Sequence, residues 1–114
     1  MKKYQYLALT CALLAGSTAA LAQGKKGAAG DAAKGKAAFE ENCSVCHNAD
    51  STERKMGPGL KGLFKKAKLD SNGKAPSDGT VIEKINEGGN GMPPYKDTLT
   101  DAERANIIAY LKSL

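Results

Sequence analysis

The chain has 114 residues, 25% of them charged and 41% hydrophobic, with a formal net charge of +5 and no tryptophan. A chain of this length forms a single small domain that buries only about 60–65% of its unfolded surface, which excludes a large apolar core. Nucleic-acid binding needs a concentrated basic patch. The densest basic stretch, residues 61–68, is more typical of a solvated surface, so we expect no nucleic-acid partner.

The first 22 residues have the three parts of a secretory signal peptide. Two lysines follow Met1, residues 6–15 are mostly apolar, and Ala20-Leu21-Ala22 is a cleavage site of small residues. A retained membrane anchor would need about 20 mostly apolar residues, and this run is shorter and interrupted by polar residues. Cys11 lies too early for a lipoprotein signal. We expect cleavage after Ala22 and a periplasmic or secreted protein.

Cleavage would leave 92 residues with 15 basic and 12 acidic side chains, a net charge of +3. Residues 23–30 are rich in glycine, alanine and lysine and predict a flexible lead-in. Residues 31–114 are predicted to form one domain. Asp31 can cap a first helix that extends to about Cys46, and the alanines within it favour helix formation.

The end of this helix carries the most informative motif in the chain. Cys43, Cys46 and His47 form the pattern C-x-x-C-H, at which haem is attached covalently to protein. Two cysteines three residues apart on one turn can each reach one vinyl group of the same porphyrin. His47 then points at the iron, and it is the only histidine in the chain. Export agrees with this interpretation, because such attachment takes place outside the cytoplasmic membrane.

Three other interpretations of the motif have less support. The two cysteines could form a structural disulfide or remain as buried thiols. A redox-active pair of the thioredoxin type is expected in a βαβ setting. A zinc site needs four ligands, usually in two separated pairs, and the sequence has no second pair. The third cysteine, Cys11, lies in the segment that we expect to be removed.

Loops and a short helix are predicted after the motif. Residues 48–55 are polar, and three of the five residues 56–60 are glycine or proline, which prevents regular structure but lets the backbone approach a flat ligand. A short helix is predicted over residues 61–69, with its apolar side chains facing inward: Leu60, Leu63 and Phe64. Residues 70–77 have the composition of a surface loop.

Two further helices complete the predicted domain. One starts near residues 77–80, with capping-box spacing between Thr80 and Glu83, and ends before Gly88. An extended loop over residues 90–95 separates it from the last helix, which opens with a second capping box at Thr100 and Glu103. Their apolar positions recur at helical spacing: Val81, Ile82, Ile85, Ile107, Ile108, Leu111 and Leu114. No stretch predicts a strand.

The order of these parts resembles the class I c-type cytochromes. The resemblance rests on a first helix ending in C-S-V-C-H, then M-G-P-G-L, then N-G-M-P-P-Y, and a last helix containing A-Y-L. It covers residues 31–114. It implies an all-α cytochrome c fold, with three to five helices packed around one covalently attached haem c.

The resemblance also implies a role for each matching position. Cys43 and Cys46 would form two thioethers with the haem, and His47 would bind the iron through Nε2. The carbonyl of Pro58 would accept a hydrogen bond from His47 Nδ1–H and fix the ring. Met92 would be the distal iron ligand through its sulfur. The first and last helices would cross where Gly35 and Phe39 meet Tyr110, and the glycine would let the backbones approach.

Met56 competes with Met92 for the distal position. A lone methionine is more often a core side chain than a ligand. Met56 lies only nine residues after His47, on the stretch whose Pro58 serves the proximal side, and it would have to cross the porphyrin plane. Met92 lies far along the chain, in a loop of the type that wraps the opposite face. We therefore expect iron ligation by His47 and Met92.

The implied function is that of a one-electron carrier without a substrate reaction of its own, cycling haem iron between Fe(III) and Fe(II). It would shuttle electrons between redox partners outside the cytoplasmic membrane. Donor and acceptor would dock near the haem edge, with lysines steering an acidic partner. We expect a monomer with at most transient membrane-surface contact. Two alternatives stay open: a dedicated haem subunit of a larger oxidoreductase, and a haem-based sensor with an open sixth position.

Overall fold

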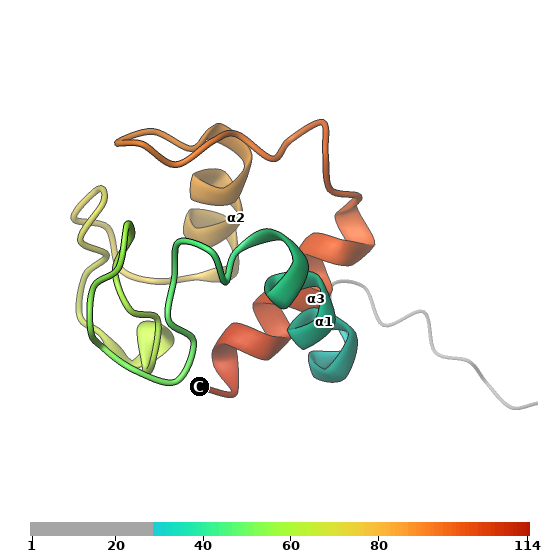
Figure 1. The fold of residues 1–114 in the computed structure, drawn as a ribbon, viewed down its shortest axis with the longest axis horizontal. Helices are drawn as coiled ribbons and strands as arrows, with labels where there is room; N and C mark the ends of the chain where they lie inside the picture. Colours follow the sequence, from blue (N-terminus) through green and yellow to red (C-terminus); the bar gives the residue numbers. More distant parts are fainter. Residues whose placement is uncertain (1–28) are drawn as a thin grey trace, which may run out of the picture.

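Four helical segments make up the structure, a computed structural model that describes residues 29–114 (Figure 1). They are α1 (Ala32–Asn42), the short 3-10 helix η1 (Leu63–Lys65), α2 (Asp78–Glu87) and α3 (Asp101–Lys112). Within residues 29–114 the only paired extended residues form an isolated bridge, between Gly89 and Met92. The all-α prediction is confirmed. The predicted signal peptide with its Cys11 lies outside the described residues, as does all but the end of the lead-in.

Helix α1 begins as predicted but ends earlier. The Asp31 carboxylate accepts hydrogen bonds from the backbone N–H groups of Ala33 and Lys34, at 2.8 and 3.0 Å. The N–H groups of Cys43 and Ser44 then both donate to the carbonyl of Phe39, so the bond from Ser44 spans five residues instead of four, breaks the helical pattern and ends the helix at Asn42. The prediction of a helix to Cys46 was wrong for this reason. The attachment motif lies in the turn that follows.

Helix α2 uses a different cap from the one predicted. The Ser77 hydroxyl accepts from the N–H of Thr80 at 3.1 Å, and the Thr80 hydroxyl accepts from the N–H of Ser77 at 2.9 Å. The capping box is therefore Ser77–Thr80, and the predicted Thr80–Glu83 box was wrong. Glu83 instead pairs with Lys74 at 3.1 Å. Gly88 ends the helix as predicted.

The structure confirms the predicted start of α3 but shortens the helix that was predicted over residues 61–69. At α3, Thr100 Oγ1 accepts from the N–H of Glu103 at 3.2 Å and Glu103 Oε2 accepts from the N–H of Thr100 at 2.7 Å, so this capping box is confirmed. The helix predicted over residues 61–69 shrinks to the three residues of η1. Gly62 before it is left-handed and Lys66 after it is extended, so neither continues a helix.

Helices α1 and α3 pack across each other at Gly35, as predicted. A side chain at Gly35 would collide with the backbone carbonyl of Asn106 and would lie 2.9 Å from Cβ of Tyr110. The rings of Phe39 and Tyr110 meet edge to face with centroids 5.5 Å apart. Only glycine leaves room for this contact, which holds the end of α1, and with it the attachment motif, against α3.

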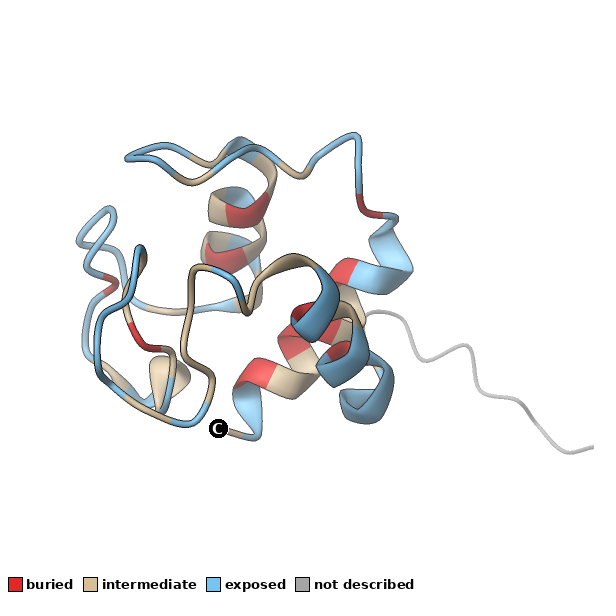
Figure 2. Ribbon diagram, in the orientation of Figure 1, coloured by how far each residue is buried: buried red, intermediate tan, exposed pale blue. Residues whose placement is uncertain are grey.

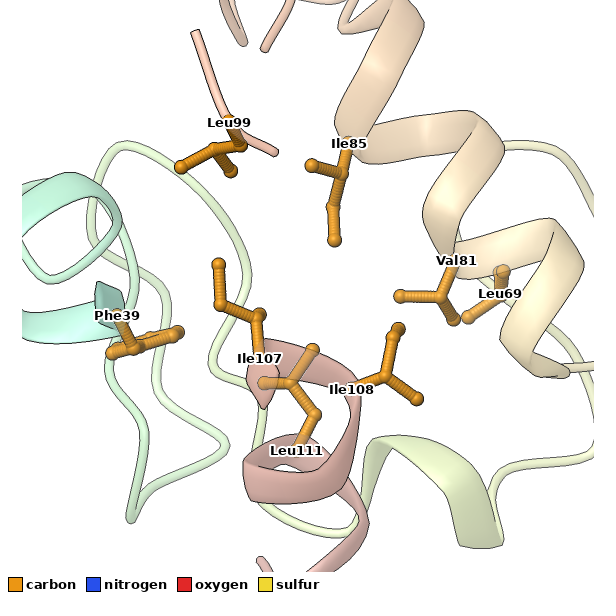
Figure 3. Close-up of a cluster of buried hydrophobic side chains, with 8 residues drawn as sticks. All are labelled: Phe39, Leu69, Val81, Ile85, Leu99, Ile107, Ile108 and Leu111. Atoms are coloured by element: carbon orange, nitrogen blue, oxygen red, sulfur yellow. The ribbon is translucent and has the colours of Figure 1, made fainter. Parts of the chain in front are cut away.

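The core consists of eight buried apolar side chains that come from α1, α2, α3 and the loops between them (Figures 2 and 3). They are Phe39, Leu69, Val81, Ile85, Leu99, Ile107, Ile108 and Leu111. Figure 3 shows them facing one another around a shared space. Leu60, Leu63 and Phe64 pack against this cluster, as predicted. None of the helices in residues 29–114 has the length and apolar character needed to cross a membrane.

Candidate functional site

A cavity of about 350 Å³ opens beside the core, within the size range of small-molecule and cofactor sites. Its walls come from the end of α1, the 54–60 loop, α2, the 89–95 loop and α3. In Figure 1 these segments surround the centre of the molecule, with the α2–α3 connection across the top of the view. Six of the eight core side chains line it: Phe39, Leu69, Val81, Ile85, Ile107 and Leu111. The cavity is therefore an apolar space into which the core itself opens.

Cys43 and Cys46 both line this cavity, half-buried and with free thiols. Burial raises the pKa of the Cys43 thiol to about 11, and the neighbouring Cys46 adds to the rise. A redox-active C-x-x-C pair works through a thiol with a lowered pKa, so this environment opposes a thioredoxin-type role. Within residues 29–114, no three His, Cys, Asp or Glu side chains gather in a group that could hold a metal ion.

His47 lies in the cavity wall with one ring nitrogen committed. Its Nδ1 lies 2.8 Å from the carbonyl oxygen of Pro58. Because a carbonyl only accepts, Nδ1 carries a proton, and the neutral ring then has its lone pair on Nε2, the form in which imidazole binds a metal. Gly57 lies against the same ring: a side chain there would collide with Cε1 and would lie 2.8 Å from Nδ1. The hydrogen bond implied by the resemblance is present, and Gly57 leaves room for it.

Met92 lines the same cavity and projects from a tight turn. The N–H of Gly89 donates to the carbonyl of Met92 at 2.9 Å, and the N–H of Met92 donates to the carbonyl of Gly89 at 3.2 Å. The two residues between them, Asn90 and Gly91, have positive φ angles of 57° and 89°. This is the geometry of a two-residue turn that asparagine followed by glycine favours. The predicted loop is therefore a defined turn, and the Asn-Gly pair could have signalled it.

Met56 also lines the cavity, but its surroundings differ from those of Met92. Met56 is 76% exposed, and its sulfur lies 3.9 Å from the sulfur of Cys46. Met92 is half-buried and packs against the core cluster. The structure thus places Met56 in solvent beside the attachment motif and Met92 among the core side chains.

The cavity has a polar rim that sequence reasoning largely missed. Lys66, Asp70 and Ser71 line it from the stretch that follows η1, and neither the predicted helix nor the turn-rich loop sequence indicates this position. Lys84 also lines it, and its spacing of three from Val81 on the same helix face could have been noticed. The Tyr95 hydroxyl donates to the carbonyl of Asn42 at 2.9 Å, and burial raises the pKa of Tyr95.

These residues fit a covalently attached haem. The cavity offers two thiols for attachment, one imidazole nitrogen with a free lone pair and one half-buried thioether, within a mostly apolar wall. This donor set matches histidine–methionine ligation of haem iron.

Comparison with known proteins agrees with this fit. The model of the cytochrome c family matches residues 32–114. Cytochrome c6 of Synechocystis is 32% identical over 105 residues, which cover 92% of this chain and 82% of the relative. The CcoP subunit of the cbb3-type cytochrome c oxidase of Azospirillum is 31% identical over 93 residues, which are 80% of this chain but only 31% of that subunit.

The fold has a solved counterpart. The structure of cytochrome c6 from the diatom Phaeodactylum tricornutum superposes with a TM-score of 0.56 at 27% identity, over 74% of this chain and 93% of the other. The sequence match, the shared fold and the arrangement of thiols, imidazole and thioether around one cavity lead to the same assignment. The chain belongs to the cytochrome c family.

Proposed function

We propose that this chain is a one-electron carrier that binds one haem c and acts outside the cytoplasmic membrane after loss of residues 1–22. When bound, haem supplies the Fe(III)/Fe(II) couple. The observation that carries the proposal is the hydrogen bond from His47 Nδ1 to Pro58, in a cavity that also holds Cys43, Cys46 and Met92.

Each functional residue of the cavity has a distinct proposed role toward the haem. Cys43 and Cys46 would hold the haem through two thioethers, and His47 and Met92 would supply the nitrogen and sulfur ligands of its iron. The Pro58 carbonyl keeps the His47 ring in one tautomer and orientation. Ligation by histidine and methionine raises the reduction potential and leaves no open position on the iron. Such a site suits electron transfer rather than catalysis or gas binding, so the protein is a carrier and not an enzyme.

Redox partners would dock where the attachment motif meets the surface. Val45 and Met56 are the two large apolar side chains that the described residues expose, at 77% and 76%. Val45 lies between the two attachment cysteines, and Met56 lines the cavity. The exposed Lys61, Lys65 and Lys68 could steer an acidic partner, at rates that fall with ionic strength. We propose a monomer that meets its partners transiently, with no nucleic-acid partner.

A dedicated subunit of a larger oxidoreductase is the second candidate, favoured by the similarity to the CcoP subunit. That match spans only 31% of the subunit, whereas the match to the Synechocystis cytochrome c6 spans 82% of the relative. The extent of the matches therefore favours an independent carrier.

The test is a spectrum of the purified protein made in a host competent in haem attachment. Denaturation in alkaline pyridine should leave a c-type haem on the chain. The reduced protein should not bind carbon monoxide, because Met92 fills the sixth position. Rapid carbon monoxide binding would indicate a sensor or catalyst, and a colourless protein would contradict the haem site altogether.

A further inference from the structure

Lys84 reaches beyond the end of its own helix to the turn that carries Met92. Its Nζ donates to the carbonyl of Gly88 at 2.8 Å and to the carbonyl of Gly89 at 3.0 Å. The first of these bonds is partly buried. None of the ion pairs among residues 29–114 includes Lys84. The ammonium group is thus engaged by backbone carbonyls at the C-terminus of α2, where a cation is favourable.

The position of Lys84 links two spaces. It lines the main cavity, and it also lines a smaller polar cavity of about 260 Å³ between the 71–74 loop, the end of α2 and the Met92 turn. Lys84 therefore lies between the apolar main cavity and the smaller polar cavity.

The Met92 turn is held to α2 at both of its ends. At its start, Gly89 receives the Lys84 hydrogen bond and closes the turn by its two backbone bonds with Met92. After the turn, the N–H of Tyr95 donates to the carbonyl of Ile85 at 3.0 Å. The second attachment is a single backbone bond. The first combines the two side-chain bonds of Lys84 with a backbone bond from the N–H of Gly88 to the carbonyl of Lys84, at 2.8 Å.

We propose that Lys84 is a positioning residue that fixes the Met92 turn on α2 and so controls how readily Met92 leaves the iron. This inference rests on the proposed function, because it takes Met92 as the distal ligand. Without the two side-chain bonds of Lys84, the carbonyls of Gly88 and Gly89 lose this donor and the start of the turn is held to α2 only by the N–H of Gly88. Met92 then moves away from the cavity more often. An outside ligand then has more time to reach the iron.

The test compares imidazole binding to the oxidised haem protein in three variants. Lys84→Met keeps most of the length of the side chain but removes every donor, and we expect about a tenfold faster binding, equal to about 1.4 kcal/mol. Lys84→Arg keeps donors on a long side chain and should restore slow binding. Lys74→Met is the matched control. It removes the exposed ion pair of Lys74 with Glu83, which lies on α2 beside Lys84, and should bind imidazole at the wild-type rate.

A second measurement needs no iron ligation by Met92. Hydrogen exchange of the Gly89 and Met92 amides, followed by NMR, should be faster in Lys84→Met than in Lys74→Met. Unchanged exchange in Lys84→Met would overturn the inference, as would an unchanged imidazole rate. If Lys84→Met failed to retain haem, Lys84→Leu, which also has no donor, would replace it, and wild-type exchange in that variant would be equally fatal. A different result would separate the two proposals. If exchange of the two amides is faster in Lys84→Met but the wild-type iron does not bind Met92, Lys84 still fixes the turn and only the proposed ligation fails.

Discussion

The imidazole of His47 has its position determined by two neighbours of different kinds. Pro58 accepts the hydrogen bond from Nδ1, and Gly57 leaves space for the ring. The motif predicts His47 as the ligand, and the resemblance supplies Pro58 as its partner. The need for glycine at residue 57 follows only from the three-dimensional contact, because the same Gly-Pro sequence would also suit an ordinary loop.

Replacing Gly57 by alanine should therefore destabilise the protein. The added methyl group would collide with the His47 ring, and overpacking of this kind costs about 1–3 kcal/mol. Thermal unfolding measures the loss. Gly79→Ala is the matched control, because a side chain there meets only Ser77 Oγ at 3.9 Å and helix propensity predicts a neutral or slightly stabilising change. Equal unfolding temperatures for the two variants would show that Gly57 does not confine the ring.

Met92 shows the limit of prediction at the scale of single residues. Distance from His47 along the chain favours it over Met56, but the chain alone does not reveal that both sulfurs lie at one cavity. Their difference in burial is a property of the fold: Met92 packs against core side chains contributed by three helices, and Met56 contacts Cys46 at the surface.

At the scale of elements, the helix boundaries illustrate how local signals compete. Ser77, Thr80 and Glu83 are spaced three apart, so two capping boxes are possible, and the structure adopts the first. Thr100 and Glu103 have no such competitor, and their prediction is confirmed. The prediction of a helix over residues 61–69 was wrong because Gly62 adopts a left-handed conformation that the apolar pattern does not reveal.

The α3 capping box gives stability a dependence on pH. The backbone N–H and then the hydroxyl of Thr100 donate to Glu103 and hold its pKa below the ordinary value of 4.5. A carboxyl with a lowered pKa in the folded state stabilises the fold above its unfolded pKa, and this contribution is lost as the pH falls through the lowered value.

Glu103→Gln should therefore reduce the loss of stability that the protein undergoes as the pH falls. Glutamine can retain the capping geometry but cannot titrate. The unfolding temperature of wild type and variant, measured between neutral pH and about pH 2, should converge as the pH falls. Asp31→Asn should behave alike, since backbone bonds from Lys34 and Ala33 lower the pKa of Asp31 as well. Parallel curves over the whole range would contradict this role of Glu103.

At the scale of the whole molecule, a bound haem would complete the core. Six of the eight buried apolar side chains border the cavity. A bound haem would cover these surfaces and add apolar contact to the core. The fold class and order of elements were predictable because the attachment motif and helical patterns are local in sequence. The polar rim of the cavity was not predictable, because the path of residues 69–77 depends on their packing against α2.

The proposed ligation requires Met92, and not Met56, to face the iron. The direct measurement is the far-red methionine-to-ferric-iron band of the oxidised haem protein, recorded for wild type, Met92→Ala and Met56→Ala. We expect the band to be present in wild type, absent from Met92→Ala and kept in Met56→Ala. A band that survives in Met92→Ala, or that disappears in Met56→Ala, would contradict ligation by Met92.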